Sequence, residues 1–117
     1  METLTYERDK MSIRDIDTIK IGTIRYKVVH EKPSQEGTAE DKITVGCIKY
    51  DKGEIWTNHE SPDDVCAITL MHEVVHGLFN HSGAYQASEK QVEGFATVLT
   101  LFIQDNPKLI EAIQKLK

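Results

Sequence analysis

The most constraining feature of this sequence is a predicted long helix, which begins near Ser61 and runs to about Asn80 and is rich in apolar residues after its first turn. Ser61 is a suitable helix N-cap, Pro62 fits the first helical position, and the two aspartates that follow suit the positive end of the helix dipole. Apolar residues cover most of the circumference, which is typical of a buried helix. They are Val65, Cys66, Ala67, Ile68, Leu70, Met71, Val74, Val75, Leu78 and Phe79. We therefore expect a central helix against which the rest of the chain packs.

The segments before this helix have the two-residue alternation of β-strands. Residues 19–31 predict two short strands joined at Gly22, and Ile43–Tyr50 with Glu54–Asn58 predict a hairpin around an Asp-Lys-Gly turn. Between these pairs, residues 31–42 are rich in glycine, proline, serine and charge, which predicts an exposed loop.

Two further helices are predicted after the central one. Ser88 caps the first of them, and Asn106-Pro107 ends it and starts the second. The first carries a helical stripe of Val92, Phe95, Leu99 and Phe102, and the second has Leu109, Ile110, Ile113 and Leu116 on its inner side. Strands followed by helices predict an α+β fold, with a small N-terminal sheet of hairpins packed on the central helix.

Length and charge limit the classes of protein that remain. The 117 residues suit a single domain, in which the charged and weakly patterned residues 1–17 are a loosely attached arm or a short helix. A net charge of −5 and a pI near 5.5 argue against a nucleic-acid ligand. The polar first ten residues predict no signal peptide, no stretch is long enough to span a membrane, and the two isolated cysteines are expected to be reduced and buried. These points predict a cytoplasmic protein.

The central helix also carries the motif His-Glu-x-x-His. His72 and His76, four residues apart, project from one face of a helix, where two imidazoles can bind one metal ion. Glu73 lies about 100° further round the helix, from where its carboxylate can take a proton from a metal-bound water. The alternative interpretation is a partly buried helix whose polar residues are solvated.

A catalytic zinc ion needs a third protein ligand and an open fourth position. Glu89 and Glu93 are candidates, since they also lie four residues apart, on the helix that follows. Two carboxylates at that spacing repel each other unless they share a cation. Without the histidines, both would be read as solvated surface charges.

These residues resemble the gluzincin pattern, in which a glutamate on a following helix completes the site. The segment "EKQVEGFA" falls on the second gluzincin motif. By this resemblance Glu89 is a zinc ligand and Glu93 orients a zinc-bound histidine, or replaces Glu89 as the ligand. Val92 and Glu93 depart from the usual small residue and Asp or Asn of that motif.

The sequence more closely resembles the small zinc peptidases of the ImmA/IrrE type that phages and mobile elements carry. The similarity covers roughly residues 18–107 and includes "TLMHEVVHGLFNHSG", "EKQVEGFATVL" and "DNP". It implies a zincin-like fold with one catalytic Zn²⁺ and a protein or peptide substrate. It also implies that an edge strand within Glu54–Asn58 runs along the cleft and pairs with an extended peptide.

Several residues have more than one interpretation. His81 or Tyr85 could stabilise the oxyanion of a peptidase, although both are also plausible surface residues. His30 and His59 have no partner by spacing and are expected to be exposed. Cys47 and Cys66 could join the two motif histidines in a structural zinc site, but the usual Cys-x2–4-Cys spacing is missing.

Two functions follow from these observations. The first is a zinc metallopeptidase, a hydrolase in which Glu73 assists the attack of water on a peptide bond. The second is a catalytically silent zincin-like binding module that acts by association with a partner protein. A set of two histidines and one glutamate also accepts manganese, iron or nickel, so the sequence does not fix the metal.

Overall fold

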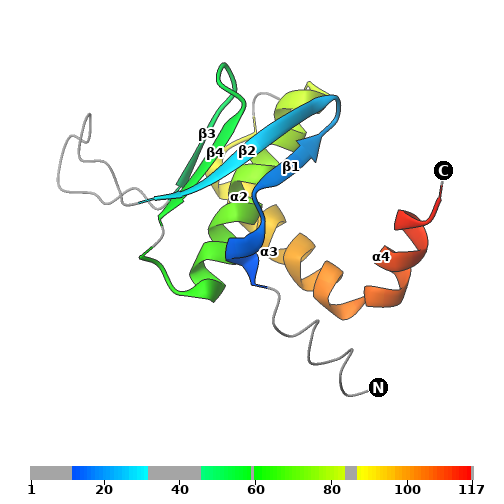
Figure 1. Cartoon of the computed structure of the whole chain (residues 1–117). Coiled ribbons are helices and arrows are strands. Elements are labelled where there is room, and N and C mark those ends of the chain that lie inside the picture. Colours follow the sequence, from blue (N-terminus) through cyan, green and yellow to red (C-terminus); the bar gives the residue numbers. More distant parts are fainter. Residues whose placement is uncertain (1–11, 32–45, 59, 84–86, 117) are drawn as a thin grey trace.

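A four-stranded mixed sheet and three helices make up the computed structural model, which describes residues 12–31, 46–58, 60–83 and 87–116. A short 3-10 helix precedes the sheet, and all three longer helices follow it (Figure 1). The elements are η1 (Ile13–Asp15), β1 (Thr18–Ile21), β2 (Ile24–Glu31), β3 (Gly46–Lys49), β4 (Glu54–Asn58), α2 (Asp63–Ser82), α3 (Glu89–Asp105) and α4 (Pro107–Gln114). The predicted α+β fold class is confirmed.

The sheet consists of two hairpins joined side by side in the order β1-β2-β4-β3. Gly22 and Gly53 each turn a hairpin with a φ of 63°, a conformation that glycine adopts without strain, so both predicted turns are confirmed. The hairpins meet where β2 and β4 pair in parallel, with Lys27 opposite Glu54. Residues 32–45, which include most of the predicted loop and the start of the predicted strand Ile43–Tyr50, lie outside the described residues.

The strand at the edge of the sheet is not the one that the resemblance implied. Glu54–Asn58 is an inner strand, because β4 pairs with β2 on one side and with β3 on the other. The edge strands of the sheet in the described residues are β1 and β3, so the expectation of an edge strand within Glu54–Asn58 was wrong. The parallel pairing caused this difference, since it joins segments 27 positions apart that no local pattern connects.

Helix α2 lies between the sheet and α3, and it buries a different face on each. Leu70 packs on the sheet residues Ile21, Tyr26, Val28 and Ile55. On the other side of α2, Val75 packs with Val92 and Ala96 of α3. The prediction that α2 is apolar and buried round most of its circumference was wrong for Val65, Ile68 and Leu78, which are exposed.

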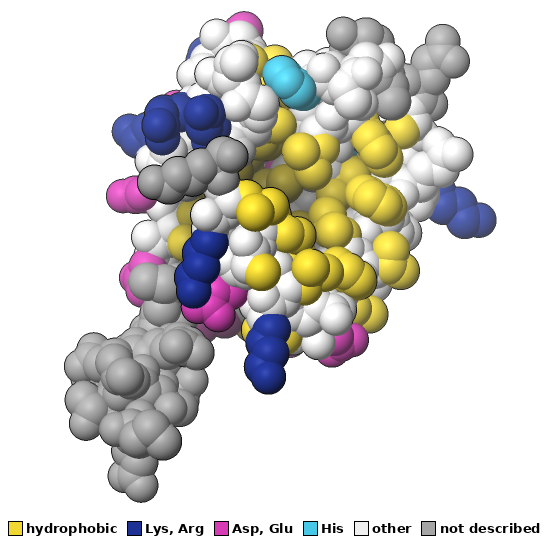
Figure 2. Space-filling model, turned by 90° about the vertical axis from the view of Figure 1, so that its right-hand side faces the viewer, with side chains coloured by type: hydrophobic (Ala, Val, Ile, Leu, Met, Phe, Trp, Pro, Cys, Tyr) yellow, Lys and Arg dark blue, Asp and Glu magenta, His cyan; other side chains and the backbone are white. Residues whose placement is uncertain are grey.

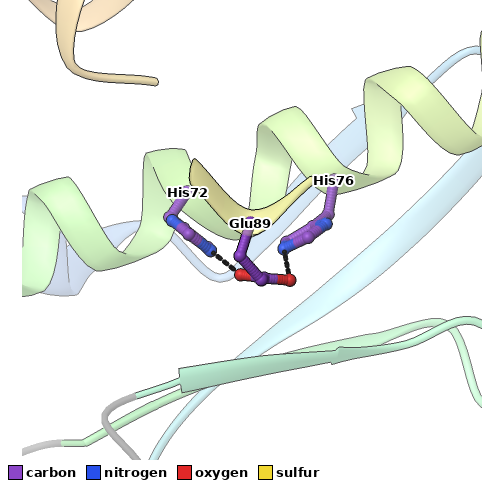
Figure 3. Close-up of side chains that lie close together, drawn as sticks. All are labelled: His72, His76 and Glu89. Carbon is purple, nitrogen blue, oxygen red and sulfur yellow. Dashed lines mark hydrogen bonds and ion pairs between the residues drawn. The ribbon is translucent and has the colours of Figure 1, made fainter. Parts of the chain in front are cut away.

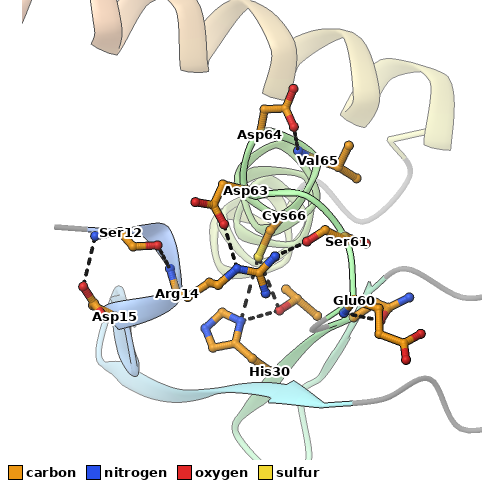
Figure 4. Close-up of polar contacts among 12 residues, drawn as sticks. Ser12, Arg14, Asp15, His30, Glu60, Ser61, Asp63, Asp64, Val65 and Cys66 are labelled. Atoms are coloured by element: carbon orange, nitrogen blue, oxygen red, sulfur yellow. Dashed lines mark hydrogen bonds and ion pairs between the residues drawn. The ribbon is translucent and has the colours of Figure 1, made fainter. Parts of the chain in front are cut away.

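The start of α2 is held by the segment that precedes the sheet (Figure 4). Pro62 is the N-cap and makes no side-chain cap bond, so the predicted capping by Ser61 was wrong. Arg14 of η1 instead donates a hydrogen bond to the Ser61 carbonyl and pairs with Asp63 at 2.7 Å. Ile13 and Ile16 pack against the sheet side of the core. Residues 12–17, the described end of the predicted arm, are therefore attached to the body of the protein.

The last two helices begin and end where the sequence predicts, but they bury less than expected. Ser88 caps α3 in a reciprocal pair of hydrogen bonds with Gln91, and Asn106 ends α3 before Pro107 starts α4. In the predicted stripe of α3, Val92 is buried and Leu99 half-buried, whereas Phe95 and Phe102 are exposed. The inner side predicted for α4 is half-buried only at Ile110, because this helix contacts α3 and joins neither core cluster. Leu109, Ile113 and Leu116 are exposed.

In the described part of the chain, no helix is both long enough and apolar enough to cross a lipid bilayer.

Candidate metal centre and active-site pocket

Two helices bring the motif side chains together. His72 and His76 lie one turn apart on α2, and their rings meet edge to face with centroids 4.8 Å apart. Glu89 is the first residue of α3, so the cap at Ser88 fixes where its side chain starts. Figure 3 shows the Glu89 carboxylate lying between the two imidazoles.

The Glu89 carboxylate contacts both histidines. Its Oε1 lies 3.0 Å from Nε2 of His72, and its Oε2 lies 3.0 Å from Nε2 of His76. One ligand atom from each of the three residues falls within 4.8 Å of the others. A tetrahedral zinc ion with bonds of about 2.0–2.2 Å separates its ligand atoms by roughly 3.5 Å, so this set fits one ion. The Glu89 side chain is 76% exposed, which leaves the centre open to solvent.

Glu73 lies beside this centre but is buried. Only 8% of the residue is exposed. Burial raises the pKa of the Glu73 carboxyl, the two neighbouring histidines oppose this shift, and the charge of Glu89 adds to it. A carboxylate with a raised pKa next to a metal site is a stronger base than an ordinary glutamate.

The pKa of Glu89 moves in the opposite direction. Its slight burial acts to raise the pKa, but the hydrogen bond to His72 and the charge and hydrogen bond of His76 outweigh that effect. The pKa of Glu89 therefore lies below its ordinary value, and the group is a carboxylate at neutral pH. The ionised form is the one that binds a metal ion.

A pocket of about 640 Å³ opens over these residues. Helices α2 and α3 form one wall, and β3 with the following Tyr50 forms the other. β3 lies close to α2 here because residue 46 is glycine: a Cβ on Gly46 would stand 2.5 Å from Cγ2 of Thr69 and 3.7 Å from Oε2 of Glu73. The volume is within the range of small-molecule and peptide side-chain sites.

Comparisons with protein-family models, curated proteins and solved structures find no match to this chain. The function therefore has to be argued from the residues of the site.

The structure places the other candidate residues differently. Glu93 lines the pocket, but among the described residues its side chain forms no hydrogen bond with either motif histidine. The ring of His81 lies against Gly22, at the turn between β1 and β2, and His81 is not among the residues that line the pocket. Tyr85 and His59 lie outside the described residues.

The cysteines do not join the histidines of the motif. Sγ of Cys66 is buried near Thr57 and His30, at 3.7 Å and 3.9 Å, in the group drawn in Figure 4. His30 is half-buried and also contacts the Ile16 carbonyl at 3.2 Å, so the prediction that His30 is exposed was wrong. In the described part of the chain, the group that could hold a metal ion contains neither cysteine.

Sequence reasoning missed the contribution of β3 and the turn after it. Tyr50 lines the pocket, and burial raises the pKa of its phenol, with Tyr26, Glu73 and Glu89 adding to the shift. Cys47 also lines the pocket, with a thiol pKa raised by burial. The alternation of the strand would have placed Gly46, Ile48 and Tyr50 on one face, but only the pairing order puts that face over α2.

Proposed function

We propose that this protein is a zinc-dependent metallopeptidase of the small ImmA/IrrE type, with a zincin-like fold. The observation that carries the proposal is the convergence of His72, His76 and Glu89 on one point beside the buried Glu73. Two histidines and a carboxylate, with one side open to solvent, are the donor set of a catalytic zinc rather than of a closed structural site.

Each residue has a distinct role in the proposed reaction. When bound by His72, His76 and Glu89, zinc would supply a Lewis acid that polarises the scissile carbonyl and lowers the pKa of water to about 7. Glu73 accepts one proton from the attacking water and passes it to the nitrogen of the departing amine, so the proton count closes. The burial of Glu73 favours this transfer, since its raised pKa makes it a better acceptor.

Tyr50 is the proposed donor to the oxyanion, in place of His81 or Tyr85. Besides the histidines, the described lining residues with a side-chain donor are Tyr50, Cys47 and Thr69. Thr69 is buried against Gly46, and a thiol is a weak donor. Tyr50 is exposed, and its phenol, like any tyrosine whose pKa is not lowered, keeps its proton at neutral pH. It can therefore donate a hydrogen bond to the negative oxygen that forms during hydrolysis.

The proposed substrate is a protein or peptide, cleaved in the cytoplasm of a bacterium or a phage-infected cell. An extended peptide could add to β3, which pairs with β4 on one side and has no strand partner on the other among the described residues. The apolar parts of the wall, Ile48 and Ile68, suit a substrate side chain.

Metal analysis and one substitution test this proposal. Purified protein should contain one zinc ion per chain, and Glu73→Gln should keep the zinc while its turnover of candidate substrates falls by roughly 10²–10⁴-fold. His72→Ala is the control, because it should lose the metal as well as the activity. If Glu73→Gln retains the full biological effect, the protein acts as a binding module and the proposal is wrong.

A further inference from the structure

Helices α3 and α4 present an apolar surface to solvent. Phe95, Val98 and Phe102 repeat at the spacing of one helical face on α3. Leu109 and Ile113 do the same on α4, and Leu116 follows directly after the end of that helix. Each of these side chains is between 44% and 76% exposed. Figure 2 shows hydrophobic side chains gathered across the side of the molecule where these helices lie. We call these six residues together with Leu101 the α3–α4 face.

This face is large for a monomeric protein. The exposed fractions of its seven residues amount to roughly 700 Å², backbone atoms included, when applied to fully accessible residues of these types. The largest apolar patch of an ordinary monomer is about 300–600 Å². A stable protein–protein interface buries about 800 Å² on each partner. The α3–α4 face therefore has nearly the area that one side of such an interface needs.

Helix α4 also needs a contact beyond those it makes within the described chain. It has eight residues, and none of them is buried. Isolated helices shorter than about 12–15 residues are marginal in water, and α4 is tied to the protein through α3. Burial of Leu109, Ile113 and Leu116 against another surface would supply the missing stabilisation.

The charges around the face favour a second copy of this chain. Residues 89–116 carry four acidic and three basic side chains, whereas the whole chain has a net charge of −5. This is a nearly neutral part of an acidic protein, so two copies can meet here with little repulsion. A two-fold interface uses the same patch on both partners, and a rim of mixed sign lets lysines of one copy face acids of the other. The same mixture does not suit an anionic membrane, which binds helices rich in lysine and arginine.

We propose that the protein is a homodimer in which the α3–α4 faces of two copies pack on each other. The two α4 helices lie within the interface, and each covers the exposed stripe of the partner's α3. The dimer does not depend on metal binding or catalysis, because none of the face residues is a proposed ligand or lines the pocket.

The experiment compares two neighbouring glutamate substitutions by light scattering coupled to gel filtration. The wild type should have twice the chain mass of 13.3 kDa at micromolar concentration. Ile113→Glu buries a charge in the proposed interface and should raise the dissociation constant of the dimer by at least ~100-fold. Gln114→Glu introduces the same residue one position later, away from the apolar stripe, and should leave the dimer intact. Zinc content and circular dichroism show that each variant is folded.

A second pair on α3 repeats the comparison. Val98→Glu should dissociate the dimer, whereas Gln104→Glu, on the opposite side of α3 from Phe95 and Phe102, should not. A monomeric wild type at 100 µM would overturn the proposal, as would equal masses for Ile113→Glu and Gln114→Glu. Sedimentation of a monomeric wild type with phosphatidylcholine–phosphatidylglycerol vesicles would also overturn it, and would identify the face as a membrane contact.

Discussion

His72 and Glu89 lie 3.0 Å apart, from Nε2 to Oε1, although they belong to different helices. No covalent or sequence-local constraint sets this distance. It depends on how α3 packs on α2, and that packing is made by Val75 with Val92 and Ala96. The geometry of the proposed metal site is therefore set by an apolar contact behind it, and we expect changes in that contact to change the affinity for metal.

Two glutamate substitutions separate the ligand from its neighbour. Glu89→Ala should weaken zinc binding by at least 100-fold, because it removes one of three ligands. Glu93→Ala should change it less than tenfold, since among the described residues the Glu93 side chain forms no hydrogen bond or ion pair with either histidine. Competition with a chromophoric chelator measures both constants. A larger loss for Glu93→Ala would make Glu93 the ligand.

Removal of one hydroxyl tests the proposed oxyanion donor. Tyr50→Phe should lower kcat by about 10²–10³-fold with little change in KM, because the hydrogen bond forms mainly in the transition state. Zinc affinity should not change. Tyr85→Phe is the matched comparison, since Tyr85 was the tyrosine that the sequence suggested. If Tyr85→Phe is the inactive variant, the assignment to Tyr50 is wrong.

Two glycines in helices should respond to alanine in opposite ways. A Cβ at Gly77 would stand 2.7 Å from Cδ1 of Ile21 and 3.3 Å from Cδ1 of Ile48, so Gly77→Ala should destabilise the protein by about 1–3 kcal/mol. Gly94 has open space around its Cβ position, so Gly94→Ala should stabilise α3 by about 0.5–1 kcal/mol. Urea denaturation of both variants measures the difference. Two shifts of the same sign would contradict the packing of Gly77 against the sheet.

The thiol of Cys47 should react at an unusually high pH. Burial raises its pKa above 9.0, Lys49 partly opposes the shift, and Glu73 and Glu54 add to it. Alkylation proceeds through the thiolate, so the rate with iodoacetamide should reach half its maximum at a higher pH than for a free thiol. Zinc and a bound peptide should slow it, since Cys47 lines the pocket. Mass spectrometry assigns the site, and buried Cys66 should stay unmodified in the folded protein.

Removal of the metal should leave the protein folded. The larger core cluster consists of Ile21, Tyr26, Val28, Ile55 and Leu70, and it contains none of the proposed ligands. After treatment with EDTA, the far-ultraviolet circular dichroism should be unchanged and Tm should fall by several degrees, as expected when a ligand of the native state is removed. Complete unfolding on chelation would instead indicate a structural zinc site.

Local signals in the sequence predict those parts of the fold that local interactions determine. Gly22, Gly53, Ser88 and Pro107 each stand where a turn or a helix end was expected, because backbone conformation and capping depend on near neighbours. The spacing of His72 and His76 likewise predicts that their rings share one side of a helix.

Features that depend on distant pairing were not predictable in the same way. The position of β4 inside the sheet depends on its parallel pairing with β2, and the place of Tyr50 over α2 follows from that order. The exposure of Leu109 and Ile113 could not be predicted for the same reason. An apolar stripe predicts that a helix face packs against something, but it does not identify the partner.

The pocket joins two separate parts of the molecule. The β3–β4 hairpin supplies Gly46, Cys47, Ile48 and Tyr50 to one wall, and among the described residues β3 has β4 as its strand partner and packs on α2. The proposed metal ligands stand on α2 and α3, which the hairpin does not contain. On the proposed function, new residues in the hairpin at positions other than Gly46, Ile48 and Tyr50 would alter which substrates are accepted without moving these ligands. Such a protein could acquire new targets over evolution while its proposed chemistry stays the same.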